Sequence, residues 1–148
     1  MELRILDAQP GHLDALEAVE RECFSIPWTR QQLLSAFPDE QHEFLVAEDV
    51  RGNVLGYVGM LAVLDEGYIS NVAVRGAYRR MGVGDALIRE LLSRSEKRAL
   101  SFVTLEVRES NTAAQGLYEK HGFSKVGRRK RYYVLPSEDA VLMTKELK

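Results

Sequence analysis

The chain of 148 residues is poor in cysteine, in long apolar runs and in excess charge. Its one cysteine, Cys23, excludes an internal disulfide, and its place on the apolar side of an expected helix favours a buried thiol over a nucleophile. No apolar run approaches the ~20 residues that span a bilayer, and no basic start precedes an apolar stretch as in a signal peptide. We therefore expect a soluble, cytoplasmic protein without membrane contact.

The near balance of charge limits the partners that the chain could take. Twenty Lys and Arg face 22 Asp and Glu, so the net charge is −2, which argues against general nucleic-acid binding. The basic run 128–131 beside Tyr132 could make a nucleic-acid platform, but a solvated strand edge is favoured because no second basic cluster joins it. His12 and His42 have no partners at metal-ligand spacing, so we expect both on the surface and no metal site.

The order of the apolar patterns predicts a mixed α/β (α+β) chain. Helices are expected to begin at 10, 29, 86 and 113, where capping residues precede apolar stripes. Strands are expected over 2–6, 43–48, 54–63, 68–74, 102–107, 123–133 and 139–147. With no linker or internal repeat, residues 1–148 are expected to form one domain with one core.

A glycine-rich turn connects the strand over 68–74 to the helix that follows. Gly82 and Gly84 carry no Cβ, so the turn can bring backbone N–H groups close to a ligand, and the start of a helix adds free amides. The natural guest is an anion, most plausibly a phosphate. A Walker loop is excluded because Asp85 follows Gly84, and a Rossmann fingerprint is excluded by Leu87; an ordinary tight turn remains the alternative.

Two residues could carry acid–base chemistry. Glu106 stands among apolar residues of a strand, where it either is desolvated, which raises a carboxyl pKa and suits a general base, or faces solvent and pairs with Arg108 or a lysine. Tyr118 lies on the next helix and could protonate a leaving group in the same cleft, or pack beside Phe123 in the core. His121 is better explained by the end of that helix than as a base.

Two motifs carry a resemblance to a known family. Arg-x-x-Gly-x-Gly over 79–84 resembles the acetyl-CoA pyrophosphate loop of the GCN5-related N-acetyltransferases (GNAT). The run L-E-V-R-E-S-N-T-A-A-Q-G-L-Y-E-K-H-G-F over 105–123 is similar to a block of protein N-terminal acetyltransferases, and the likeness extends over nearly the whole chain. It implies a GNAT fold, a central, mostly antiparallel sheet of about seven strands flanked by about four helices.

The resemblance also implies roles for individual residues. Glu106 would be the proton acceptor and Tyr118 the proton donor, and Trp28, Glu66 and Tyr132 would bind the substrate. Backbone groups of the strand would meet the acetyl and pantetheine arm, the loop would hold the pyrophosphate, and an asparagine would bind further along. The residues implied for acetyl-CoA are Val72, Ala73, Val74, Arg79, Arg80, Met81, Gly82, Val83, Gly84, Asp85 and Asn111.

The family implies an acetyl-CoA-dependent acetyltransferase that acts on a protein N-terminal amine, the N-terminal alanine of a small-subunit ribosomal protein, with a monomer favoured. The alternatives are an acetyltransferase of small amines and a non-catalytic acyl-CoA-binding module. Two departures bear on this. Phe24 to Trp28 contains two more residues than the Phe-Pro-Trp of the family pattern, and Asp85 puts a negative charge beside the expected phosphate. Asp85 could point away from the anion or weaken its binding.

Overall fold

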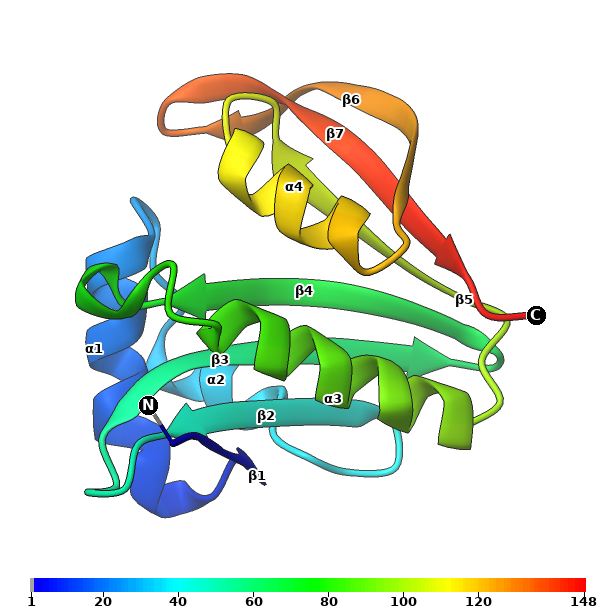
Figure 1. The fold of residues 1–148 in the computed structure, drawn as a ribbon. Coiled ribbons are helices and arrows are strands. Elements are labelled where there is room, and N and C mark those ends of the chain that lie inside the picture. Colours follow the sequence, from blue (N-terminus) through cyan, green and yellow to red (C-terminus); the bar gives the residue numbers. More distant parts are fainter. Residues whose placement is uncertain (1) are drawn as a thin grey trace.

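A computed structural model describes residues 2–148 and contains one seven-stranded sheet with four α-helices. Figure 1 shows the elements in chain order. The strands are β1 (Arg4–Asp7), β2 (His42–Glu48), β3 (Val54–Val63), β4 (Glu66–Val74), β5 (Phe102–Arg108), β6 (Ser124–Val134) and β7 (Ser137–Glu146). The helices are α1 (Leu13–Cys23), α2 (Arg30–Ser35), α3 (Val83–Lys97) and α4 (Thr112–Lys120), with 3₁₀ turns at Pro10–His12 and Gly76–Tyr78. The expected fold class is confirmed.

The sheet has the order β1-β2-β3-β4-β5-β7-β6, and every neighbouring pair is antiparallel except β4 and β5. β4 and β5 pair only at their beginnings, from Glu66 opposite Phe102 to Tyr68 opposite Thr104. Beyond this point the two strands diverge, as Figure 1 shows between the green β4 and the yellow-green β5. This divergence leaves an opening in the middle of the sheet, between the later parts of β4 and β5.

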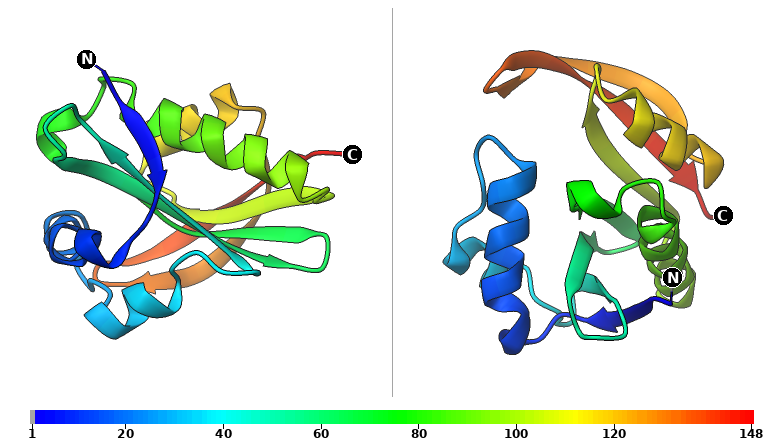
Figure 2. Two further views of the ribbon diagram at one scale, coloured as in Figure 1. Left: turned by 90° about the horizontal axis from the view of Figure 1, so that it is seen from below. Right: turned by 60° about the vertical axis from the view of Figure 1, so that its left-hand side comes forward.

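The helices cover both faces of the sheet (Figure 2). α1 and α2 pack on one face around a cluster that includes Leu16, Leu33 and Phe44. α3 packs on the other face through Leu87 and Leu91, and α4 extends the same cluster. These side chains are buried because apolar residues recur along one side of each helix, which is the pattern that the sequence presents. None of the helices within residues 2–148 is long and apolar enough to cross a membrane.

Local signals in the sequence explain most element boundaries. Thr29 accepts a hydrogen bond from the Gln32 amide at 3.2 Å while the Gln32 side chain accepts one from the Thr29 amide at 2.9 Å, which confirms the expected capping box. β4 begins at Glu66, two residues before the predicted strand. The expectation that His12 lies on the surface is wrong, because its side chain is 13% exposed and its Nε2 lies 2.7 Å from a Glu48 carboxylate oxygen.

Candidate active site

Two adjoining cavities follow the opening between β4 and β5. The first has a volume of about 550 Å³ and lies between the end of β4 and the beginnings of α3 and α4. The second has a volume of about 670 Å³ and lies between β4, β5, the α1–α2 connection and the β6–β7 hairpin. They share five wall residues, Cys23, Phe24, Val72, Asn111 and Tyr118. The two cavities are therefore neighbours that meet beside Tyr118.

The glycine turn forms one end of the first cavity. Gly82 has φ +84° and immediately precedes α3, whose first intrahelical hydrogen bond runs from the Ala86 amide to the Gly82 carbonyl at 3.0 Å. The amides of the three residues before Ala86 thus lie ahead of the helical hydrogen-bond ladder and can bind an anion. The wall contains ten of the eleven residues predicted for acetyl-CoA, and Met81 is the one outside it.

Asp85 is turned toward α4. Its Oδ1 lies 3.0 Å from Lys120 Nζ and 3.0 Å from His121 Nε2. The hydrogen bond from Lys120, followed by that from His121, lowers the pKa of the Asp85 carboxyl. Of the two possibilities for Asp85, pointing away from the anion or weakening its binding, this geometry favours the first, because its charge is compensated by side chains of α4.

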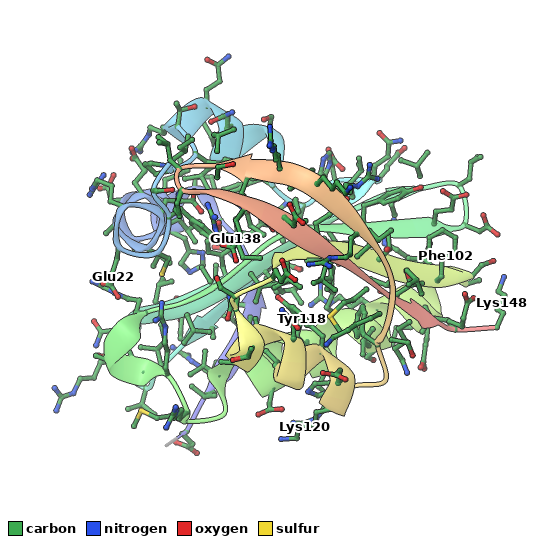
Figure 3. The ribbon with its side chains drawn as sticks, turned by 90° about the horizontal axis from the view of Figure 1, so that it is seen from above. Glu22, Phe102, Tyr118, Lys120, Glu138 and Lys148 are labelled. Atoms are coloured by element: carbon green, nitrogen blue, oxygen red, sulfur yellow. The ribbon has the colours of Figure 1, made fainter. Side chains whose placement is uncertain are left out.

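Tyr118 is 6% exposed and lies on the inner side of α4, while Lys120 lies on the outer side (Figure 3). Its ring packs against Phe123 with centroids 5.8 Å apart, so the expected core packing is present. The residue nevertheless lines both cavities, and burial raises the pKa of its hydroxyl. The hydroxyl is therefore protonated at neutral pH and is available as a donor to a group bound where the cavities meet. Asn111 starts the same helix, and its Oδ1 accepts from the Ala114 amide at 3.1 Å.

Glu106 lines the second cavity from β5. Its Oε1 lies 3.1 Å from Arg129 Nε of β6, so the carboxylate has an ionic partner. This partner differs from the expected ones, which were Arg108 or a lysine. Arg108 instead contacts Glu138 at 3.1 Å and lies over the Tyr133 ring, 4.3 Å from its centroid. The pKa of the Tyr133 hydroxyl is raised to about 12, and burial is the largest cause. Arg108 thus lines the second cavity, while Arg129 contacts Glu106 from β6.

The predicted substrate residues are only partly brought together. Trp28 and Tyr132 line the second cavity from opposite sides, Trp28 from the α1–α2 connection and Tyr132 from β6. Glu66 lies outside the walls of both cavities and accepts a hydrogen bond from the hydroxyl of Tyr68, which does line the second. Above the cavity, the Ser25 hydroxyl donates to the Leu135 carbonyl, so the longer α1–α2 connection touches the β6–β7 turn.

Sequence reasoning missed a buried polar chain beneath the same cavity. Glu20 of α1 is 1% exposed; its Oε1 accepts from the Trp28 amide at 2.6 Å and its Oε2 accepts from the Tyr57 hydroxyl. Asn71 Nδ2 donates to the Tyr57 oxygen at 3.1 Å. Burial raises the pKa of Glu20, and the hydrogen bonds from Tyr57 and Trp28 oppose that shift. The one signal in the sequence for this polar chain is that Glu20 stands within the apolar stripe of a helix.

Cys23 also lines both cavities, which the sequence did not indicate. Its thiol is half-buried and donates to the Val74 carbonyl at 3.6 Å. Burial raises the pKa of the thiol, so its protonated form is favoured. The expectation of an apolar, unreactive role fits this geometry.

Comparison with known proteins assigns the family. The model of the acetyltransferase (GNAT) family matches residues 13–123, three quarters of the chain and both motif segments. The chain belongs to the GNAT acetyltransferase family. A ribosomal protein bS18-alanine N-acetyltransferase of Escherichia coli is 34% identical over 133 residues, which cover 88% of each chain. The enzyme of the same name from Haemophilus influenzae is 33% identical over 134 residues, 88% of this chain and 89% of that one.

Solved GNAT structures agree with this assignment. The crystal structure of the ribosomal-protein-S18-alanine N-acetyltransferase from Escherichia coli superposes with a TM-score of 0.90 at 31% identity, covering 99% of this chain and 95% of that one. Acetyl-CoA is the co-substrate of GNAT acetyltransferases. The first cavity fits it: the beginning of α3 offers free amides to a pyrophosphate, and a Cβ at Gly84 would lie 2.9 Å from Leu117, so glycine is needed for the close packing there.

Proposed function

We propose that the chain transfers the acetyl group of acetyl-CoA to the N-terminal amine of a protein, namely the N-terminal alanine of the ribosomal protein bS18. The observation that carries the proposal is the meeting of the two cavities beside Tyr118, with the glycine turn at one end and Glu106 at the other. The choice of substrate is supported by the names of relatives that are 33–34% identical over 88% of the chain.

The chain's own residues divide the proton transfers. Acetyl-CoA supplies the acetyl group as an activated thioester. Glu106 accepts the proton of the amine, directly or through water, and Arg129 holds its carboxylate in place at 3.1 Å. An α-amine has a pKa of about 7.7–8.0, so removal of one proton near neutral pH needs only a weak base. Tyr118 is protonated at neutral pH and lines both cavities where they meet, so it can donate its proton to the departing thiolate.

The second cavity receives the protein end. Trp28 and Tyr132 enclose it from two sides, and the contact between Ser25 and Leu135 closes it above, so a narrow chain end fits better than a folded surface. Two residues outside the cavity walls stay predictions: Met81 for binding acetyl-CoA and Glu66 for binding the substrate. We also propose that the enzyme is cytoplasmic, because its proposed substrate is a ribosomal protein, and that residues 1–148 act as one domain and as a monomer.

The proposal is tested by CoA thiol release from acetyl-CoA with four acceptors. These are an Ala-starting peptide, the same peptide with a blocked N-terminus, a peptide whose only amine is a lysine side chain, and spermidine. We expect release with the free Ala peptide alone. Release with spermidine but not with the Ala peptide contradicts the proposed substrate and leaves the acetyl-CoA assignment intact.

A further inference from the structure

The buried polar chain of Glu20, Tyr57 and Asn71 lies outside the proton transfers described above. Glu20 and Tyr57 are 1% and 0% exposed, and the Tyr57 ring stacks on Phe44 in the core. Burial of a carboxylate is unfavourable unless every oxygen is hydrogen-bonded, and here both oxygens are. These hydrogen-bonded side chains connect α1 to the wall of the second cavity, so we expect their effect at that wall.

The direction of each hydrogen bond follows from the groups available. The Trp28 amide can only donate, so Glu20 Oε1 accepts. The Tyr57 hydroxyl has one proton, which it gives to Oε2 of the Glu20 carboxylate. Its oxygen is then left to accept, and it does so from Asn71 Nδ2 at 3.1 Å. The negative charge of Glu20 therefore determines which way the Asn71 amide is turned.

Asn71 connects the buried polar chain to the second cavity. It lies on β4 immediately before Val72 and lines the second cavity. The register of β3 and β4 shifts here, since Asn71 pairs with Gly59 while Ile69 pairs with Met60. Within residues 2–148 the structure gives no hydrogen-bond donor to Asn71 Oδ1. An acceptor in a cavity wall matches a ligand that carries N–H groups.

We infer that Asn71 Oδ1 accepts a hydrogen bond from the substrate's N-terminal amine, and that Glu20 and Tyr57 are positioning residues that hold the amide in this orientation. The inference rests on the proposed function. It adds a second contact with the acceptor amine to the one proposed for Glu106. The same Glu20 carboxylate holds the Trp28 amide, so one buried charge links two walls of the second cavity.

Kinetics of four variants test the inference. Asn71→Leu removes the acceptor at similar volume, and we expect the KM for the Ala peptide to rise about 10- to 100-fold, as for loss of a hydrogen bond to a charged group. Glu20→Gln lets an amide donate to Tyr57, so the chain of hydrogen bonds can reverse and turn Asn71 Nδ2 toward the amine. Glu20→Gln and Tyr57→Phe should raise the same KM, while the KM for acetyl-CoA stays within twofold.

The matched control is Thr104→Val, which removes a half-buried strand hydroxyl bonded to the Met143 carbonyl at 3.0 Å. It lies outside both cavity walls and should leave both KM values unchanged. A merely structural role for Glu20 would instead raise both KM values together and lower the melting temperature. A peptide KM within twofold of wild type in Asn71→Leu overturns the inference.

A second readout does not depend on turnover. The chain has three asparagines, and triple-resonance NMR of the wild-type protein assigns the side-chain amide signals of Asn71 among them. With CoA in place of acetyl-CoA, the free Ala peptide should shift these signals and the N-terminally blocked peptide should not. Signals that ignore the free peptide contradict the inference even if Asn71→Leu fails to fold.

Failure of the proposed function looks different, because the wild-type protein would then release no thiol with the Ala peptide. In that event the amine that is turned over replaces the peptide in both experiments. The predicted contact joins Asn71 Oδ1 to an amine N–H group. The change in KM and the shift of the Asn71 amide signals therefore test it with that amine as well.

Discussion

Replacement of Gly82 by valine separates backbone strain from the crowding of a ligand. Gly82 has φ +84°, and a Cβ built there meets nothing within 4 Å, so a side chain has room in the protein itself. Holding a non-glycine residue at such a φ costs about 1–3 kcal/mol. For a chain of this size, each kcal/mol lowers the melting temperature by about 2–4 °C.

The matched control is Gly52 in the β2–β3 turn. Gly52 has φ +82°, its Cβ would also meet nothing within 4 Å, and it lies outside both cavity walls. Gly52→Val therefore reproduces the strain of Gly82→Val without a ligand beside it. We expect similar losses of melting temperature in both variants.

Only Gly82→Val should weaken CoA binding. The side chain keeps the pyrophosphate from the free amides at the start of α3, and loss of one hydrogen bond to a charged group amounts to about 10- to 100-fold in affinity. Isothermal titration calorimetry with CoA measures the difference. If Gly82→Val and Gly52→Val bind CoA equally well, the phosphate does not lie at this turn and the assignment of the first cavity is refuted.

Three further predictions concern the proton transfers and one ion pair. Glu106→Gln should lower kcat by roughly 10²–10⁴-fold with the Kd for CoA unchanged, and a normal kcat would remove Glu106 as the base. Tyr118→Phe should slow thiol release while circular dichroism reports an unaltered fold; an unaffected rate assigns the residue to packing alone. The pKa of Asp85 is lowered by Lys120 and then by His121, so the pair stabilises the fold above pH 3.8 and ceases to do so as the pH falls below it. Asp85→Asn should thus lower the melting temperature at pH 7 and converge with wild type in acid, and a constant difference across pH would argue against the ion pair.

The sequence predicts the elements well because their signals are local. The capping residues Thr29 and Asn111 and the apolar helix stripes act within a few residues, and the structure has each of them. The parallel start of β4 and β5 is not local in this sense. The three residue pairs between these strands, and the divergence beyond them, depend on the side chains that pack between β4 and β5. The opening at the site therefore cannot be predicted from local sequence signals.

The same distinction applies to the charged side chains. Glu106 pairs with Arg129, 23 residues along the chain, because β7 lies between β5 and β6 in the sheet and brings the two strands close enough for the side chains to meet. Glu20 reaches Tyr57 across the face between α1 and β3. Neither partner can be inferred from spacing along a strand or helix. The glycine turn before α3 could be predicted because the residues that form it are neighbours in the sequence, whereas the roles of Glu106 and Tyr118 stay predictions.

The central claim is most directly tested by locating the acetyl group on a protein product. Ribosomal protein bS18 with an N-terminal alanine is incubated with the enzyme and acetyl-CoA, and tandem mass spectrometry identifies the modified nitrogen. The account predicts acetylation of the N-terminal amine, abolished in Glu106→Gln. Acetyl groups on lysine side chains, or an unmodified protein under conditions in which spermidine is acetylated, would contradict it.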